Sequence, residues 1–350
     1  MPRIPIRTAV AAVAAVVTVA VAVPTLSATA SAPTTTDRAA AAAGWLARQL
    51  RGVNHDHFTI TFGSQTFPNY GETADGVLSM DAAGVAHDAA NRATSYLAKH
   101  VNDYAKGSPT YYPGATAKLI LVVAAQHRAV HNFGGVDLIK VLRDSEGAGG
   151  AAPGEFQQNP GLSGDSFIVS QALPVLALAI APNASGPSDA SVAFLASQQC
   201  PDGGFMSTVR PDPATACTSE EVDSTGYAVQ ALFAAGAKTD ALQGIAWLRR
   251  GQHSDGGFGS PANANSTALA TQALIAAHYG VNGAVAWLVR HQVGCAGSVS
   301  RRGAVTFRGT FDGSALLATS QAAAALARKP LAWIDGTGAR AAAPVLACGS

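Results

Sequence analysis

The chain has 350 residues, of which 48% are hydrophobic and 13% are charged, and its formal net charge at pH 7 is +1. Nucleic-acid binding requires a basic patch that neutralises phosphates, so this composition argues against a nucleic-acid partner. After the first 32 residues, no apolar segment is long and uninterrupted enough to span a bilayer, so we expect no stable membrane anchor in the mature protein.

The first 32 residues have the pattern of a secretory signal peptide. Arg3 and Arg7 precede an apolar stretch over residues 9–23, and small residues follow up to Ala32. A charged start, a short apolar run and a small-residue end are typical of a segment that is cleaved on export. An uncleaved anchor helix is the alternative. We therefore expect a secreted protein with one domain over residues 33–330 and a tail over residues 331–350.

Six pairs of helices are predicted along the mature chain, each an amphipathic helix followed by a more apolar one. In chain order, the pairs are 40–50 with 73–84, 89–104 with 115–127, 136–143 with 165–180, one pair within 191–236, one within 244–277, and 284–292 with 312–327. An apolar helix must be buried, whereas an amphipathic helix can face solvent, so we expect an inner and an outer ring. Neither end of the array has the polar face that caps an open solenoid. The sequence therefore predicts an all-α (α/α)6 toroid.

Two of the pairs carry the same loop motif, Gln-x-x-Asp-Gly-Gly-Phe. Its residues are Gln199, Asp202, Gly203, Gly204 and Phe205 in one loop, and Gln252, Asp255, Gly256, Gly257 and Phe258 in the other. The glycines can supply positive φ, the Phe can anchor the loop, and the Asp can satisfy its backbone donors. The Gln can reach a neighbouring helix end. We expect a structural role for both loops.

These loops, each followed by an Ala/Leu-rich helix with Ser or Thr, resemble the repeats of the prenyltransferase and squalene/terpene cyclase superfamily. The secreted actinobacterial-type members are the most similar. The resemblance implies an α/α toroid with a funnel-shaped central cavity. The sequence lacks the family's catalytic motifs. The Asp-x-Asp-Asp acid of class II cyclases is missing, and where protein prenyltransferases have a zinc-binding Cys after the Asp, Asp312 is followed by Gly313 and Ser314. Lys118 is the only cation on the inner helices that could bind a diphosphate.

Polar residues occur near the starts of the predicted inner helices, and in a toroid these starts gather at one mouth of the cavity. They are Asp75, Asp165, Asp223, Asn265 and Asp312, with Tyr227 one turn further along. Such a ring could bind a cation, an amine or a polar ligand. The alternative is that each residue caps its own helix.

We predict no cofactor and no metal. His127 and His131 have the i, i+4 spacing of two ligands on one helix, but they lack the acidic neighbour of a metalloprotease helix. His55 and His57 lie in a segment rich in Thr, Phe and Gly, which we expect to be a surface loop.

The four cysteines suit an oxidising compartment and allow three disulfide pairings. We favour Cys200 with Cys217, which would close a long loop, and Cys295 with Cys348, which would tie down the C-terminal tail. A zinc site is the alternative, but no Cys-x-x-Cys or comparable Cys/His spacing is present.

Three functional hypotheses follow. The first is a non-catalytic, monomeric, secreted toroid whose central cavity binds a small hydrophobic or amphipathic ligand. The second is a terpene cyclase-like or prenyltransferase-like enzyme that uses a non-standard acid, such as Asp165 or Asp223. The third is a structural or interaction module of the cell envelope whose cavity is filled by its own side chains.

Overall fold

The computed structural model describes residues 32–107, 111–147, 152–157, 166–210, 212 and 214–349. The predicted signal peptide, apart from its last residue Ala32, and Asp165 lie outside these residues. The part of the chain from Ala32 onward forms one compact unit.

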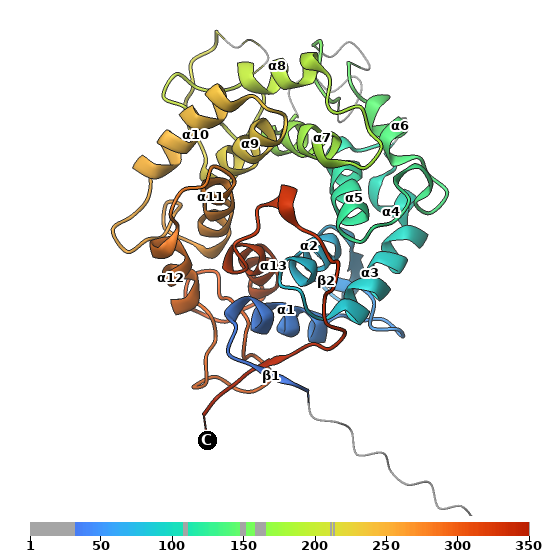
Figure 1. Ribbon diagram of the computed structural model, residues 1–350, viewed down its shortest axis with the longest axis vertical. Helices are drawn as coiled ribbons and strands as arrows, with labels where there is room; N and C mark the ends of the chain where they lie inside the picture. Colours follow the sequence, from blue (N-terminus) through green and yellow to red (C-terminus); the bar gives the residue numbers. More distant parts are fainter. Residues whose placement is uncertain are drawn as a thin grey trace, which may run out of the picture. The chain divides into compact units, whose positions relative to one another are not determined.

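Six inner helices form a closed ring (Figure 1). They are α2 (Tyr70–Ala82), α5 (Pro113–Ala125), α7 (Ile168–Ile180), α9 (Val222–Ala234), α11 (Ala264–Ala276) and α13 (Ala315–Leu326). Each helix packs against the next, and α13 packs against α2. Matching positions of neighbouring helices meet, as where Lys118 of α5 contacts Asp75 of α2. The inner helices therefore run in the same direction, and their N-terminal ends gather at one mouth.

Six outer helices surround this ring (Figure 1). They are α1 (Arg38–Gln49), α3 (His87–Lys99), α6 (Leu138–Arg143), α8 (Asp189–Ser197), α10 (Lys238–Arg250) and α12 (Asn282–Arg290). Their inward residues, such as Leu248 and Leu288, are fully buried, whereas Arg250 and Arg290 are exposed. The predicted (α/α)6 toroid is confirmed.

The outer helix predicted over residues 89–104 is divided in two. The backbone of His100, at φ −118° and ψ 24°, leaves the helical region, so α3 ends at Lys99 and the short helix α4 spans Val101–Ala105. A 3-10 turn, η1, follows α5 at Val130–Asn132.

The Asp of each repeated loop connects that loop to the next outer helix. The indole N–H of Trp247 donates to Asp202 Oδ2 at 2.9 Å, and that of Trp287 donates to Asp255 Oδ2 at 3.1 Å. Gln199 Nε2 also donates to the carbonyl of Asp240 at 2.9 Å, at the start of α10. Each loop thus holds its own repeat against the following one.

The two glycines of each loop have different roles, which corrects the expectation that both supply positive φ. Gly203 has a φ of 102°, and a Cβ there would lie 2.4 Å from the carbonyl oxygen of Gln243. Gly204 has no positive φ, but its Cβ would lie 2.7 Å from the indole nitrogen of Trp247. The second glycine is therefore required by the packing of the tryptophan.

A recurring hydrogen bond attaches the end of an outer connection to the inner helix that follows in five of the six described repeats. In four repeats a buried backbone N–H donates to a Thr hydroxyl in the inner helix. The pairs are Phe58 with Thr73, Phe205 with Thr225, Phe258 with Thr267 and Val305 with Thr319, at 2.8 to 2.9 Å. In the third repeat, Gln171 Oε1 accepts from Phe156 N at 2.8 Å instead.

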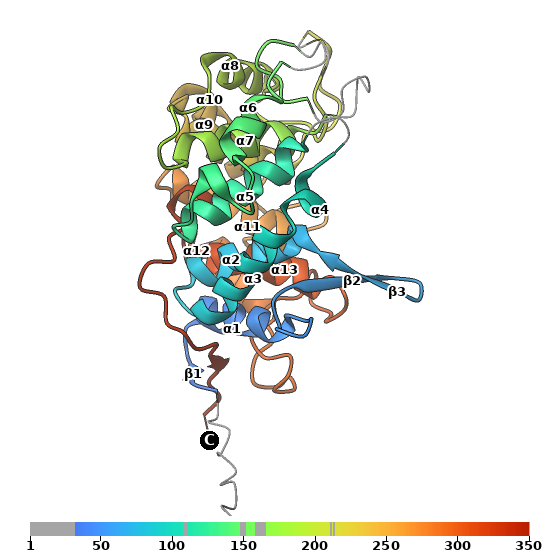
Figure 2. The ribbon, with the colours of Figure 1, turned by 90° about the vertical axis from the view of Figure 1, so that its right-hand side faces the viewer.

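Residues 58–69 form a β-hairpin where we expected a surface loop. Strand β2 (Phe58–Phe62) pairs antiparallel with β3 (Gln65–Asn69), so that Phe58 faces Asn69 and Phe62 faces Gln65. Gly63 and Ser64 make the two-residue turn. The hairpin projects from the body just before α2 begins (Figure 2).

The C-terminal segment, residues 330–347, forms a strap across the C-terminal ends of the inner helices. It begins with η3 (Leu331–Trp333) and ends with β4 (Val345–Leu346), which pairs in parallel with β1 (Thr34–Thr35). Gly336 N donates to Ala125 O, the last residue of α5, and Arg340 N donates to Gly84 O, just after α2. The chain thus closes one mouth of its own ring.

Candidate functional site

The strap fills the centre of the toroid from its C-terminal side. The backbone N–H of Leu331 donates to Gln230 Oε1 on α9 at 2.9 Å, which places η3 inside the ring (Figure 1). The cavity left at this level is lined by Asp75, Tyr227, Leu331 and Ile334, among others, and its volume is about 20 Å³. That volume holds about one water molecule. A ligand larger than this must approach from the N-terminal mouth.

An ion pair lies in the inner ring, about halfway along α2 and α5. Lys118 Nζ on α5 is 2.9 Å from Asp75 Oδ1 and 3.0 Å from Oδ2 on α2, and the two side chains are only 18% and 14% exposed. Burial alone would lower the pKa of the Lys118 ammonium, but the Asp75 carboxylate outweighs burial and raises it. Lys118 is therefore charged. Burial, and next the charge of Asp75, raise the pKa of the nearby Glu72.

Two tyrosines complete a polar cluster around this pair. Tyr227 on α9 is within electrostatic range of Lys118, Asp75, Asp223 and Tyr104, the last from α4. Burial raises the pKa of the Tyr227 phenol and also that of Tyr104. Both phenols are therefore protonated at neutral pH and can donate a hydrogen bond.

Asp223 connects this cluster with a cavity of about 510 Å³ at the N-terminal ends of α9 and α11. The cavity is lined by Glu220, Glu221, Val222, Asp223, Trp247, Gly251, His253, Gly259, Ser260, Asn263 and Ser266. Burial raises the pKa of Asp223, and the Ser266 hydroxyl partly offsets this by donating a hydrogen bond. Burial and the charge of Asp223 raise the pKa of Glu221. The wall of this cavity is thus rich in hydrogen-bond acceptors and poor in cations.

The remaining residues of the predicted ring are placed differently. Asn265, in the first turn of α11, has a buried Oδ1 with no hydrogen-bond partner among the described residues. Asp312 is exposed and accepts hydrogen bonds from the Ser314 hydroxyl and, at 2.9 Å, from the Ser314 backbone N–H. The bond from the hydroxyl, and next that from the backbone, lower the pKa of Asp312. Asp312 therefore stabilises its own turn outside the cluster.

The histidines singled out in the sequence have protein partners. His127 Nε2 lies 2.8 Å from Asp335 Oδ1 of the strap, and His131 Nδ1 lies 3.1 Å from Asp137. In the described part of the chain, one group has the spacing of a metal site, namely Cys200, Cys217 and Glu220, and its two sulfurs form a disulfide. The second disulfide joins Cys295 to Cys348, so both pairs are those favoured from the sequence.

Sequence reasoning missed Tyr104 because α4 belongs to the outer layer, where no ligand-facing residue was expected. Lys118 was recognised as the only inner cation, but its pairing with Asp75 depends on which helices are neighbours. The spacing gave a weak signal, since Asp75 and Lys118 hold the same position in consecutive inner helices.

Comparison with solved structures identifies the architecture. The type II terpene cyclase MstE from Scytonema, in complex with geranylgeranyl dihydroxybenzoate, matches with a TM-score of 0.55 and 16% identity over 83% of this chain and 95% of that one. The fold is that of the terpene cyclases. The ent-copalyl diphosphate synthase from Streptomyces platensis also matches, with a TM-score of 0.50 and 19% identity over 74% of this chain. The match spans only 50% of the length of that synthase.

A similar toroid also occurs in a protein solved with a bound ligand. Haptocorrin in complex with Cbi matches with a TM-score of 0.50 and 17% identity, over 75% of this chain and 63% of haptocorrin. The sequence matches no protein-family model and no curated protein. At these identities the comparisons show the fold alone, so the function must be argued from the site.

Proposed function

We propose that the protein is a secreted, non-catalytic toroid that binds a small amphipathic ligand at its N-terminal mouth. The observation that carries this proposal is the polar cluster of Asp75, Lys118, Tyr104 and Tyr227 inside a ring of apolar helices. Replacing a buried ion pair by well-packed apolar residues is often neutral or stabilising, so stability alone is a weak reason to keep such a cluster. Polar contact with a ligand is a stronger reason to keep the cluster.

The charges of the site favour a neutral or cationic head group. Lys118 is already paired with Asp75 and is also the cation that acts on Glu72, so two carboxyls share one positive charge. Asp223 adds a third carboxyl, and no cation acts on it among the described residues. A diphosphate would meet net repulsion here. A hydroxyl or an amine would find acceptors in the carboxylates and donors in the two phenols.

The described residues give less support to a cyclase. Protonation of an alkene requires a strong acid, which neighbouring groups provide by lowering the pKa of a carboxyl. Burial instead raises the pKa of Asp223, the sequence-based candidate for this role among the described residues. Asp223 is thus a weaker acid than an ordinary aspartate and is better suited to accept hydrogen bonds.

Export is part of the proposal. Two disulfides are compatible with an oxidising compartment outside the cytoplasm. Among the helices that the structure describes, none combines the length and the apolar character that crossing a bilayer requires.

Native mass spectrometry of the non-reduced protein, purified from the culture medium of its own host, tests this proposal. We expect a bound small molecule with a neutral or basic head group, lost on denaturation. Tyr227→Phe removes one donor and should lower the bound fraction about tenfold or more, since a buried partner is left unpaired. Tyr279→Phe, at a partly exposed tyrosine after α11, is the matched control and should retain the ligand. An empty wild-type protein, or one that converts an added isoprenoid, would overturn the proposal.

A further inference from the structure

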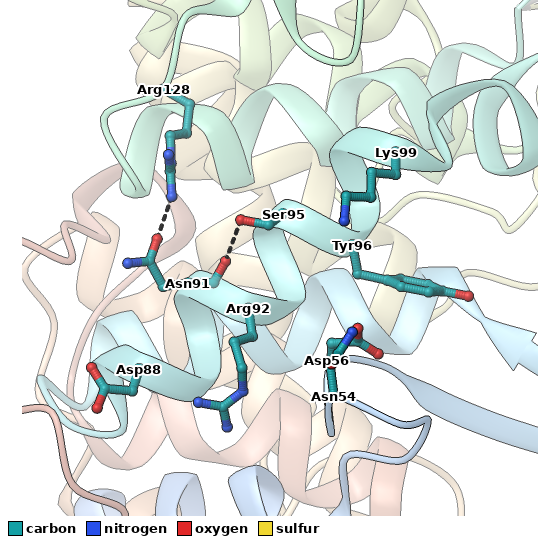
Figure 3. Close-up of a pocket in the computed structure, with 9 residues that line it drawn as sticks. All are labelled: Asn54, Asp56, Asp88, Asn91, Arg92, Ser95, Tyr96, Lys99 and Arg128. Carbon is teal, nitrogen blue, oxygen red and sulfur yellow. Dashed lines mark hydrogen bonds between the residues drawn. The ribbon is translucent and has the colours of Figure 1, made fainter. Parts of the chain in front are cut away.

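A second cavity lies on the outside of the toroid, along α3. Its volume is about 570 Å³, within the usual range for small-molecule sites. One wall is the face of α3 that carries Asp88, Asn91, Arg92, Ser95, Tyr96 and Lys99. Asn54 and Asp56, from the loop before the hairpin, and Arg128, from the loop after α5, complete it (Figure 3).

Three cations enter this cavity. Arg92 and Lys99 are two helical turns apart on the same face of α3, and neither has an ion-pair or hydrogen-bond partner among the described residues. Arg128 leans over from the neighbouring loop, and its guanidinium donates to Asn91 Oδ1 (Figure 3). The loop that carries Arg128 is thereby tied to α3, so the three positive charges share one pocket.

The acidic side of the cavity is held in place by stacking. Asp56 Oδ1 lies 2.8 Å from His57 Nδ1, and the His57 ring stacks on Tyr96 with centroids 4.2 Å apart and an interplanar angle of 12°. His100 contacts Tyr96 as well, with centroids 4.3 Å apart. The loop that presents Asp56 is thus docked on α3, and its carboxylate has a defined position in the cavity.

We propose that this cavity binds a small anionic sugar, meaning a saccharide unit that bears one carboxylate or phosphate. Arg92, Lys99 and Arg128 supply the charge that recognises the anion. Asp56 and Asp88 would repel a bare anion, but they accept hydrogen bonds from hydroxyl groups, and Asn54 and Asn91 both donate and accept them. A ligand that has an anion at one end and hydroxyls at the other satisfies both sets. The cavity is separate from the central cluster and does not depend on the function proposed for it.

Isothermal titration calorimetry of the full chain with four probes tests the proposal. Glucuronate and glucose 6-phosphate carry the two possible anions on a sugar, glucose lacks the anion, and inorganic phosphate lacks the sugar. We expect at least one sugar anion to bind tenfold or more tightly than both glucose and inorganic phosphate, and more weakly at higher salt. Whichever sugar anion binds better identifies the anionic group.

Variants locate the binding. Arg92→Gln and Lys99→Gln should each raise the Kd of the sugar anion tenfold or more. Lys238→Gln, at an exposed lysine of α10 across the ring, should leave that Kd unchanged. Asp88→Asn should weaken the binding of the sugar anion but strengthen the binding of inorganic phosphate. Equal affinity for inorganic phosphate and the sugar anions would reduce the cavity to a nonspecific cationic patch and overturn the proposal. The absence of binding, or equal losses in Lys238→Gln, would also overturn it.

Discussion

Asp81 lies in the last turn of α2, beneath the strap, and is 2% exposed. Its Oδ1 accepts from Gln126 Nε2 at 2.6 Å, and its Oδ2 has no partner among the described residues. Burial raises the pKa of the Asp81 carboxyl to about 7, although the hydrogen bond from Gln126 and the charge on His127 act in the opposite direction. A Cβ at Gly336 of the strap would lie 2.7 Å from Oδ1, so the strap covers this carboxyl directly.

Asp81→Asn should remove a pH dependence of stability. The pKa is about 7 in the folded chain and 3.8 for an ordinary aspartate, so between these values the folded state retains a proton that the unfolded state has released. The contribution of Asp81 to the free energy of unfolding therefore falls as pH rises from about 4 to about 7, by up to about 4 kcal/mol, and is flat above that. Urea unfolding at pH 4, 5.5, 7 and 8 measures it. Asp88→Asn, at an exposed carboxyl, should keep the wild-type slope, and an unchanged slope in Asp81→Asn would contradict the assignment.

Single residues of the site could be predicted only where their element was predictable. Asp75, Asp223 and Tyr227 follow from the rule that inner helices begin at one mouth. The same rule included Asp312, which is exposed, because the helix α13 begins at Ala315, three residues later than the predicted start. Asp81 gave no signal, since its burial is produced by the strap from the far end of the chain.

At the scale of the helix pair, the Thr hydroxyls that accept the recurring backbone hydrogen bond should contribute to stability. Thr225→Val would leave the Phe205 N–H buried without a partner, at a cost of about 1–3 kcal/mol in the free energy of unfolding. Thr225→Ser keeps the hydroxyl and should cost less than about 1 kcal/mol. Chemical denaturation of the three proteins checks this. A larger loss for Thr225→Ser than for Thr225→Val would mean that the methyl group, and not the hydrogen bond, matters.

The repeat made most helices predictable, because an apolar helix following an amphipathic one recurs six times. Helix ends were less predictable: α5 begins at Pro113 and not at Ala115, which agrees with the preference of proline for the first turn. The hairpin was missed although its signal was present, since Phe58, Ile60 and Phe62 alternate with Thr before a Gly-Ser turn. Its position inside an all-helical repeat hid that alternation.

At the scale of the whole molecule, closure of the ring follows from the repeat, but closure of its mouth does not. The strap is held by backbone bonds from Gly336 and Arg340 and by the pairing of β4 with β1 at the other end of the described chain. Such bonds use backbone N–H and C=O groups, which nearly all residues have, so no pattern of side chains predicts them. The disulfide between Cys295 and Cys348 was the only sequence feature that indicated where this segment ends.

That disulfide should keep the strap closed as well as stabilise the fold. It spans 53 residues, whereas the disulfide between Cys200 and Cys217 spans 17. Loop-closure entropy then predicts that C295S/C348S loses about 4 kcal/mol of unfolding free energy and C200S/C217S about 3 kcal/mol. The two variants should differ little in this free energy but strongly in which part of the chain opens locally.

Amide hydrogen exchange separates the two effects. In C295S/C348S the amides of Gly336 and Arg340 should exchange much faster than in C200S/C217S, because the strap can then leave its mouth without unfolding the ring. Exposure of Asp81 follows from the same opening, so above pH 7, where its carboxylate is charged and gains from hydration, the protection factors of these amides, which correct for the faster intrinsic exchange at high pH, should be lower still. If both amides stay protected at pH 8 in C295S/C348S, the backbone bonds and the packing of Leu331 hold the strap without the disulfide. The closed mouth would then be a permanent part of the fold.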